Sequence, residues 1–448
     1  MIKRKIDSFL TDFFAQDKKA LMLTGARQIG KTFSIRRFGH MQFESFLEIN
    51  FIENPSLVKV FSNAKNSQDI LLRLSTITNQ ELVKGNTLVF FDEVQECPEI
   101  VTAIKFLVEE GSYRYILSGS LLGVEIKNLR SAPVGYLDIK DMYPLDIEEF
   151  ATAVGIKEST IELLRTHFDE CTAVDEFIHE KMMEVFRLYL IVGGMPAAVE
   201  KYINTNNLQD VMAEQQSIIR LYKQDIAKYD PDHKLYIEDI FDRIPAELDA
   251  KNKRFILKNL NENIKFSRYK NSFLWLKDAG VALPVYNVEE PTIPLILSSS
   301  RNLFKLFMSD IGLLASLYAD GIQLKILDNE PSINFGSVYE NAVAQELCAH
   351  GFQLYYYNNK RQGELDFLIE QNGEVLPIEV KSGKDYERHK ALTNVVSSTT
   401  YNIPKAYVLC NDNIKTVGKI TYLPIYMLMF IKKAKSLPTN YKIDLSGL

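Results

Sequence analysis

GARQIGKT spans residues Gly25 to Thr32 and directly follows the apolar run ALMLT at residues 20–24. The pattern G-x-x-x-x-G-K-T between a strand and a helix is typical of a phosphate-binding loop. Its glycines let backbone N–H groups surround a β-phosphate, the Lys31 ammonium meets the β- and γ-phosphates, and the Thr32 hydroxyl ligates Mg²⁺. We therefore predict ATP and Mg²⁺ as ligands, rather than a plain strand–loop–helix connection. The predicted nucleotide-binding residues are Gly25, Ala26, Arg27, Gln28, Ile29, Gly30, Lys31, Thr32 and Phe33.

A second strand-like run, TLVFF at residues 87–91, ends in Asp92 and Glu93. In a P-loop ATPase the first carboxylate holds Mg²⁺ through water and the second polarises the attacking water; the alternative is an acidic turn after a core strand. We predict Thr32 and Asp92 as the magnesium residues, and Glu93 and Lys31 as catalytic residues. After the run at residues 114–117, Ser118 is the predicted third catalytic residue, a sensor of the γ-phosphate. Ser120 is a weaker candidate, and either serine could instead cap a helix.

Strand-like runs at 20–24, 45–51, 87–91, 114–118 and 135–139 alternate with helical segments, including one from Thr32 that Gly39 is expected to end. This alternation predicts an α/β fold with a doubly wound parallel sheet, and ATP at the carboxyl ends of its strands. Residues 144–235 have a helical pattern that GGMP at residues 193–196 interrupts. Residues 236–325 and 326–448 complete the chain as two further segments.

Composition is that of an ordinary globular protein, because 46% of the 448 residues are hydrophobic and 25% are charged. The net charge of −6 argues against indiscriminate coating of nucleic acid. Four cysteines without paired spacing indicate neither a disulfide framework nor a zinc site and suit a reducing cytoplasm. No N-terminal signal pattern is visible, and the apolar stretch 420–431 is too short to cross a bilayer. We therefore expect a cytoplasmic protein without a membrane partner.

One segment has a positive net charge, although the chain as a whole is negative. Residues 251–270 contain seven basic residues and one acid, Glu262. With helix-turn-helix-like lengths and a downstream strand pair near 281–283 and 293–295, this segment predicts a winged helix that contacts DNA phosphates. The alternative is a solvated, lysine-rich helix face.

The C-terminal part carries a second set of chemically active residues. GELDFLIE at residues 363–370 and EVLPIEVK at residues 374–381 predict two strands joined by a turn near Asn372. Period-two alternation places Glu379 and Lys381 on one face, with Asp366 on the neighbouring strand. Two carboxylates can hold Mg²⁺ against a phosphodiester, while a lysine orients the attacking water. A helix beginning near residue 336 offers Glu340 as a third carboxylate; the alternative is a surface ion pair.

The chain closely resembles a large group of prokaryotic AAA-superfamily ATPases over nearly its whole length. The resemblance rests on GARQIGKT, FFDEVQ with Pro98, LSGSLLG, PVG, YPLDIEEF and GGMPAAV, and on FKLFMSDIGLL, YEN, GELDF and PIEVKSG further on. The C-terminal part of the chain resembles a winged helix followed by a PD-(D/E)XK, restriction-endonuclease-like fold. The resemblance thus implies a P-loop ATPase core at 1–143, a helical lid at 144–235, a winged-helix-like domain at 236–325 and a nuclease-like domain at 326–448.

For the sites, the resemblance implies ATP binding by Gly25, Gly30, Lys31 and Thr32, Mg²⁺ at Asp92 and hydrolysis through Glu93. It also suggests Glu340, Asp366, Glu379 and Lys381 as a nuclease-like set. Relatives often carry a basic residue after PVG, where this chain has Tyr136. Arg130 is the nearest substitute for a trans-acting arginine.

Two functions follow from these patterns. The first is an ATP-driven switch or motor that acts on DNA through residues 251–270 and carries a nuclease-like module. The second is a regulatory ATP-binding protein whose C-terminal fold is a catalytically silent interaction platform. A homo-oligomer is compatible with both.

Overall fold

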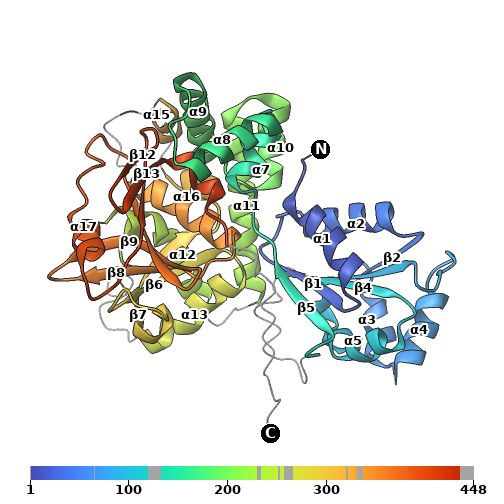
Figure 1. The fold of residues 1–448 in the computed structure, drawn as a ribbon. Helices are drawn as coiled ribbons and strands as arrows, with labels where there is room; N and C mark the ends of the chain where they lie inside the picture. Colours follow the sequence, from blue (N-terminus) through green and yellow to red (C-terminus); the bar gives the residue numbers. More distant parts are fainter. Residues whose placement is uncertain are drawn as a thin grey trace, which may run out of the picture.

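The computed structural model describes residues 2–64, 66–119, 133–229, 234–250, 253–256, 266–318, 321–328, 330 and 336–433. Serine 120 and Arg130 lie outside these ranges, as do Lys251, Lys258 and Lys265 of the basic segment. The described chain forms an N-terminal lobe around one sheet and a larger lobe around a second sheet (Figure 1).

The N-terminal sheet is five-stranded and entirely parallel, with the order β2-β3-β4-β1-β5. Its strands are β1 (Ala20–Thr24), β2 (Ser45–Asn50), β3 (Thr87–Asp92), β4 (Arg114–Ser118) and β5 (Leu137–Asp141). All five predicted strands are therefore confirmed, with their bounds within two residues. This is the fold of a P-loop NTPase.

Helices cover both faces of this sheet, which explains why β1 and β3 are buried throughout. Leu21 and Leu23 pack towards α1 (Lys5–Gln16) and α2 (Lys31–Gln42), whereas Met22 belongs to the core on the opposite face. That second face is covered by α3 (Ser56–Ser62), α4 (Ser67–Thr76) and α5 (Pro98–Glu110). The 3-10 turn η1 (Val94–Glu96) leads from β3 into α5.

The prediction that Gly39 ends the helix after the phosphate-binding loop is wrong, since α2 continues to Gln42. A Cβ at Gly39 would lie 2.2 Å from the ring of Phe46 on β2. Close packing of helix on strand, rather than helix termination, is the physical reason for a glycine here.

Helices then form most of the chain from residue 147 to residue 278, as predicted for 144–235. They are α7 (Ile147–Ala153), α8 (Glu158–Glu170), α9 (Glu176–Val192), α10 (Pro196–Thr205), α11 (Leu208–Tyr229), α12 (Lys234–Asp249) and α13 (Phe266–Asp278). The break at GGMP separates α9 from α10, as predicted. No single helix among the described residues is long and apolar enough to cross a bilayer; α9 and α10 satisfy that test only jointly, across a bend of 120°.

The second sheet is mixed and eight-stranded, with the order β12-β13-β11-β10-β9-β8-β6-β7. Its strands are β6 (Ala282–Val288), β7 (Ser299–Met308), β8 (Tyr355–Asn359), β9 (Gly363–Gln371), β10 (Glu374–Val380), β11 (Ala406–Cys410), β12 (Lys415–Val417) and β13 (Ile420–Pro424). The accompanying helices are α14 (Ile311–Ser316), α15 (Ile322–Leu327), α16 (Gly336–Ala349) and α17 (Lys390–Ser397), with 3-10 turns η4 (Leu295–Ser298) and η5 (Ile425–Phe430). The mixed α/β character predicted for this part is confirmed.

The hairpin predicted at residues 371–373 is present, since β9 and β10 pair antiparallel and Asn372 and Gly373 both have positive φ. The strand predicted at 293–295 is wrong. The antiparallel partner of β6 is β7, with Leu283 opposite Phe307, and residues 295–298 form a 3-10 turn. Pro294 has no N–H to contribute to a strand ladder, which favours a turn at this point.

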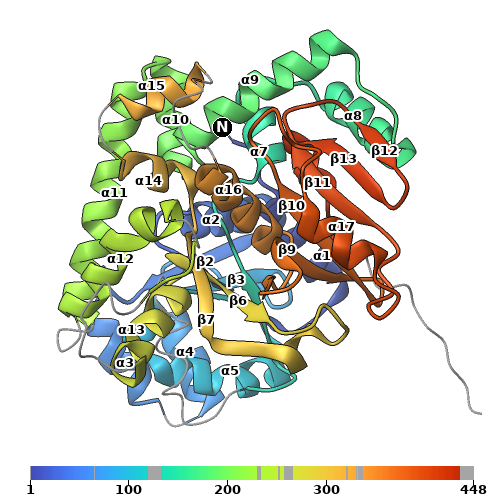
Figure 2. The same ribbon diagram turned by 90° about the vertical axis from the view of Figure 1, so that its left-hand side faces the viewer.

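Strands β6 and β7 come from the predicted winged-helix segment, yet they share one sheet with the C-terminal strands. Helix α16 lies against this sheet beside β10 (Figure 2). One hydrophobic core runs from the α1–α2 face of the N-terminal sheet through the helical region to this second sheet. The four-domain division stays a prediction.

Candidate functional site: an ATP site and a buried carboxylate–lysine cluster

The phosphate-binding loop between β1 and α2 has the backbone shape that its glycines allow. Gly25 and Gly30 have φ angles of 125° and 91°, in the region that favours glycine. A Cβ at Gly25 would lie 2.2 Å from the Met142 carbonyl oxygen, so this position cannot carry a side chain without rearrangement. Gly30 is the N-cap of α2, which places the unpaired N–H groups of the first helical turn at the loop.

Lys31 is buried and folds back over the loop. Its Nζ donates to the carbonyl oxygens of Gly25 (2.9 Å) and Ala26 (2.7 Å). Burial lowers the pKa of Lys31 to about 8, even though the nearby Glu93 and Asp92 charges oppose this shift. A phosphate that replaces the two carbonyl contacts would restore the ammonium form.

ATP binding is therefore expected to take up protons in alkaline solution. At pH 8 about half of the free protein has a neutral Lys31, so binding should consume about half a proton per ATP. At pH 6.5 the lysine is already charged, so proton uptake on ATP binding should be close to zero. Calorimetry in buffers of different ionisation enthalpy measures this; a binding enthalpy independent of buffer at pH 8.5 would contradict the role of Lys31.

Asp92 lies at the carboxyl end of β3, beside Thr32. Its Oδ2 accepts from Thr32 Oγ1 (3.1 Å) and Asn50 Nδ2 (3.1 Å), and its Oδ1 accepts from the Ser118 hydroxyl. Burial raises the pKa of Asp92, while the bonds from Ser118 and Thr32 act in the opposite direction. A hydroxyl and a carboxylate in contact at the helix N-terminus are oxygen ligands of the kind that Mg²⁺ prefers.

Asn50 was not predicted from the sequence. It is the last residue of β2, and its side chain reaches the same carboxylate as those of Thr32 and Ser118. A polar residue at the carboxyl end of a predicted parallel strand was the signal available for it.

Glu93 follows Asp92 in a left-handed conformation, with a φ of 55°. Such a backbone is uncommon for a residue other than glycine and is found where a site needs it. Gln95 Nε2 donates to Glu93 Oε2 over 2.6 Å and so orients the carboxylate. Tyr136, the residue after PVG, donates to Glu109 Oε1 over 2.6 Å.

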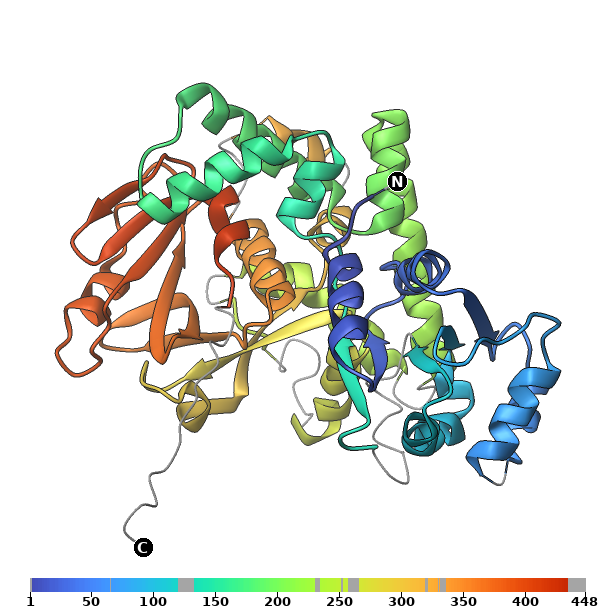
Figure 3. The ribbon, with the colours of Figure 1, turned by 45° about the vertical axis from the view of Figure 1, so that its right-hand side comes forward.

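Segments distant in sequence hold the loop. Arg27, predicted to contact nucleotide, has its Nη1 2.6 Å from Asp225 Oδ1 on α11, the long helix beside the N-terminal lobe (Figure 3). Tyr222, also on α11, donates to the Arg27 carbonyl oxygen over 3.2 Å. After α13, a Cβ at Gly280 would lie 2.8 Å from the Ala26 nitrogen. The helical region and the second lobe thus touch the loop that would bind phosphate.

The four residues of the predicted nuclease-like set meet on one side of the second sheet. Ile378 pairs with Phe367, which brings Asp366 opposite Glu379, and the Val380 N–H donates to Asp366 Oδ2 over 2.9 Å. Lys381 Nζ lies 2.7 Å from Glu379 Oε1. Glu340 on α16 reaches this group through shared contacts with Lys305.

Lys305 is the member of this cluster that the sequence analysis missed. It is 0% exposed, and its Nζ lies 2.8 Å from Glu364 Oε1, 3.4 Å from Glu340 Oε2 and 3.9 Å from Asp366 Oδ1. Lys253 also pairs with Glu340. A single charge inside the apolar run of β7 was the signal available for Lys305. We refer to Lys253, Lys305, Glu340, Glu364, Asp366, Glu379 and Lys381 as the carboxylate–lysine cluster.

Burial and neighbouring carboxylates set the charges in this cluster. Burial, with Glu340 and Glu379 nearby, raises the pKa of Asp366 far above its usual range. The pKa of Glu379 is raised as well, chiefly by burial. Burial would also raise the pKa of Glu340, but Lys305 and Lys253 outweigh it and hold that pKa below its ordinary value. The lysines therefore supply the charge compensation that a metal ion would otherwise provide.

Comparisons with known proteins agree with this fold. Residues 17–151 match the AAA domain family, residues 183–326 match a domain of unknown function (DUF8612) and residues 335–428 match another (DUF4143). No curated protein matches the chain.

Several solved structures are similar. They include a Walker-type ATPase of Pyrococcus abyssi (16% identity, 71% of this chain and 96% of that chain, TM-score 0.43) and C. elegans PCH-2 (13%, 48% and 69%, 0.28). A structure of katanin that concerns its self-assembly is a further match (18%, 36% and 57%, 0.24). Residues 17–151 are thus similar to AAA domains, and the parallel sheet that they form has the fold of a P-loop NTPase.

Proposed function

We propose that the protein binds ATP with Mg²⁺, hydrolyses it, and uses the change at the phosphate-binding loop to reposition the second lobe. The observation that carries this proposal is the arrangement of Lys31, Thr32, Asp92 and Glu93 at one end of the parallel sheet. Mg²⁺ would neutralise the phosphate charge between Thr32 and Asp92. Lys31 would contact the β- and γ-phosphates, and Glu93 would accept a proton from the attacking water.

The contacts around the loop supply a route for coupling. Arg27 is held by Asp225 of α11, and Gly280 packs against Ala26. A bound phosphate would draw Lys31 away from the Gly25 and Ala26 carbonyl oxygens. The loop conformation would then change where Asp225 and Gly280 contact it. The switch proposal therefore assigns α11 and the turn after α13 as the elements that respond to nucleotide.

For the second lobe we propose a DNA-directed role, with residues 251–270 as the DNA-binding segment and the carboxylate–lysine cluster as a nuclease-like site. The convergence of Glu340, Asp366, Glu379 and Lys381 supports a nuclease-like site. The fully buried Lys305 favours the alternative, a catalytically silent platform, because its ammonium compensates the same carboxylates that would bind the metal.

The active form of this proposal predicts two measurable effects of DNA. Duplex DNA should raise ATP turnover, and the wild-type protein should nick supercoiled plasmid with Mn²⁺ or Mg²⁺. Asp366→Ala and Lys381→Ala should both abolish nicking while leaving ATP turnover without DNA unchanged, since neither residue contacts the ATP site. Nicking that survives both substitutions would come from a contaminant. Absence of nicking by wild type, together with DNA-independent turnover, would establish the silent-platform alternative.

A further inference from the structure

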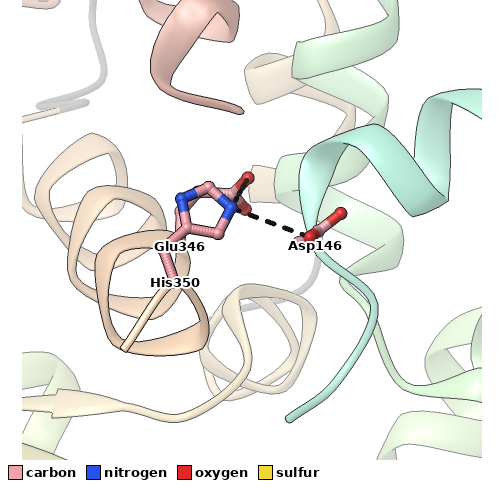
Figure 4. Close-up of side chains that lie close together, drawn as sticks. All are labelled: Asp146, Glu346 and His350. Atoms are coloured by element: carbon pink, nitrogen blue, oxygen red, sulfur yellow. Dashed lines mark ion pairs between the residues drawn. The ribbon is translucent and has the colours of Figure 1, made fainter. Parts of the chain in front are cut away.

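A second buried polar cluster lies outside the ATP site, where the first turn of α7 meets α16. Asp146 is the N-cap of α7, Glu346 lies in the last turn of α16, and His350 directly follows the end of that helix. His350 Nε2 is 3.4 Å from Glu346 Oε1 and 3.7 Å from Asp146 Oδ2 (Figure 4). One ligand atom from each residue lies within 4.8 Å of the others. About two hundred residues of chain separate Asp146 from its two partners, so no sequence motif marks this cluster.

The histidine is oriented as a ligand. Its Nδ1 lies 2.8 Å from the Ile431 carbonyl oxygen, which can only accept, so Nδ1 carries a hydrogen and donates. Nε2 then faces the two carboxylates. A backbone carbonyl that fixes the ring tautomer in this way is the usual outer partner of a metal-bound histidine.

Two atoms in the cluster lack a hydrogen-bond partner among the described residues: His350 Nε2 and Glu346 Oε1. Their side chains are only 5% and 0% exposed. Glu346 is fixed by the Ile147 N–H, which donates to its Oε2 over 3.0 Å, so Oε1 is left facing the imidazole. Two buried polar atoms that face each other without a hydrogen bond are unfavourable, and a metal cation between them would satisfy both.

We propose that Asp146, Glu346 and His350 bind one divalent transition-metal ion, for which Zn²⁺ is the best fit. Mg²⁺ and Ca²⁺ prefer oxygen ligands alone, whereas Zn²⁺ accepts imidazole together with carboxylates. Ligand atoms about 2.0–2.1 Å from a tetrahedral Zn²⁺ lie about 3.4 Å apart, which is the His350–Glu346 separation. A cavity of about 240 Å³, bounded by Lys5, Lys140, Asp146 and Ala349, reaches the cluster at Asp146.

Lys5 is the internal competitor for this ion. Its Nζ pairs with Asp146 and lies 2.7 Å from Glu148 Oε2, and its side chain is 41% exposed. Metal binding would move this ammonium onto Glu148 and solvent. A bound ion would then fasten the ATPase domain to α16, next to Arg4, which donates to the Ile29 carbonyl oxygen of the phosphate-binding loop over 3.1 Å.

Calorimetric titration of the full chain with Zn²⁺, after chelator treatment and without nucleotide, tests the site. Wild type should bind one equivalent. His350→Gln and Glu346→Gln should lower that affinity by at least about 100-fold, because each removes a direct ligand. The matched control is His167→Gln: this exposed ring contacts Thr172 and should leave Zn²⁺ binding unchanged. Asp92→Asn should also leave it unchanged, which separates this site from the ATP site.

The competing explanation is a protonated His350 that pairs with both carboxylates and needs no metal. It predicts no Zn²⁺ uptake by wild type, or equal uptake by wild type and His350→Gln, and either result would overturn the proposal. If the two ligand variants fail to fold, Lys5→Gln decides: removal of the ammonium should raise Zn²⁺ affinity about tenfold. Co²⁺ bound to wild type should show visible d–d absorption that Zn²⁺ abolishes; unchanged affinity in Lys5→Gln, or no such absorption, contradicts the site.

Discussion

Replacing Glu93 with glutamine is expected to leave ATP binding intact and to lower the turnover number by a factor of about 10²–10⁴, the usual contribution of a general base. Glutamine keeps the size of the side chain and its contact with Gln95, but it cannot accept a proton from the attacking water. Steady-state phosphate release and nucleotide binding, measured on the same preparation, separate the two effects.

Lys31→Ala should behave differently, because the lysine contacts phosphate before the reaction as well as during it. We expect this variant to lose ATP binding together with turnover. Glu99→Gln is the matched control for Glu93→Gln. Glu99 lies in the first turn of α5, and its Oε2 accepts a long hydrogen bond of 3.8 Å from the Cys97 thiol. Wild-type turnover in Glu93→Gln would remove Glu93 from the mechanism.

Lys305→Met is expected to have the largest effect on stability. It removes a fully buried ammonium and leaves Glu340, Glu364 and Asp366 without their shared partner, which typically costs about 3–5 kcal/mol. Trp275 on α13, the only tryptophan of the chain, is buried. Its fluorescence therefore follows the unfolding of this lobe in urea. Lys381→Met, which removes a partly exposed ammonium from the same cluster, should cost less.

The destabilisation should depend on pH in a defined direction. Lys305 and Lys253 hold the folded pKa of Glu340 below its ordinary value of 4.5. A depressed carboxyl pKa stabilises the fold above the ordinary value and loses this effect as the pH falls through the folded value. The difference between wild type and Lys305→Met should therefore be full at pH 7 and shrink below pH 4.5.

Divalent cations then reveal what the cluster can bind. If its carboxylates are able to hold a metal, Mn²⁺ should recover part of the stability that Lys305→Met loses and should stabilise this variant more than wild type. Equal unfolding of wild type and Lys305→Met at pH 7 would contradict the charge-compensating role of Lys305. No recovery with Mn²⁺ would argue that the cluster is an ion-pair network alone.

Local sequence was sufficient to predict the phosphate-binding loop and the strands beside it, because the loop consists of contiguous residues. Eight consecutive residues set the phosphate-binding loop, and the apolar runs before Gly25 and Asp92 predicted the two buried parallel strands that place these residues together. The pairing of Asp366 with Glu379 was also readable, since a two-residue turn fixes the register of a hairpin.

Residues whose roles depend on distant partners were not readable in this way. Lys305, Asn50 and Asp225 acquire their contacts only when strands and helices far apart in the chain come together. Gly39 looked like a helix terminus, but the aromatic ring of Phe46 decides why a side chain is excluded there. Asp146, Glu346 and His350 show the same limit most clearly, because burial and opposing charge at one point are properties of the folded chain and leave no periodicity in the sequence.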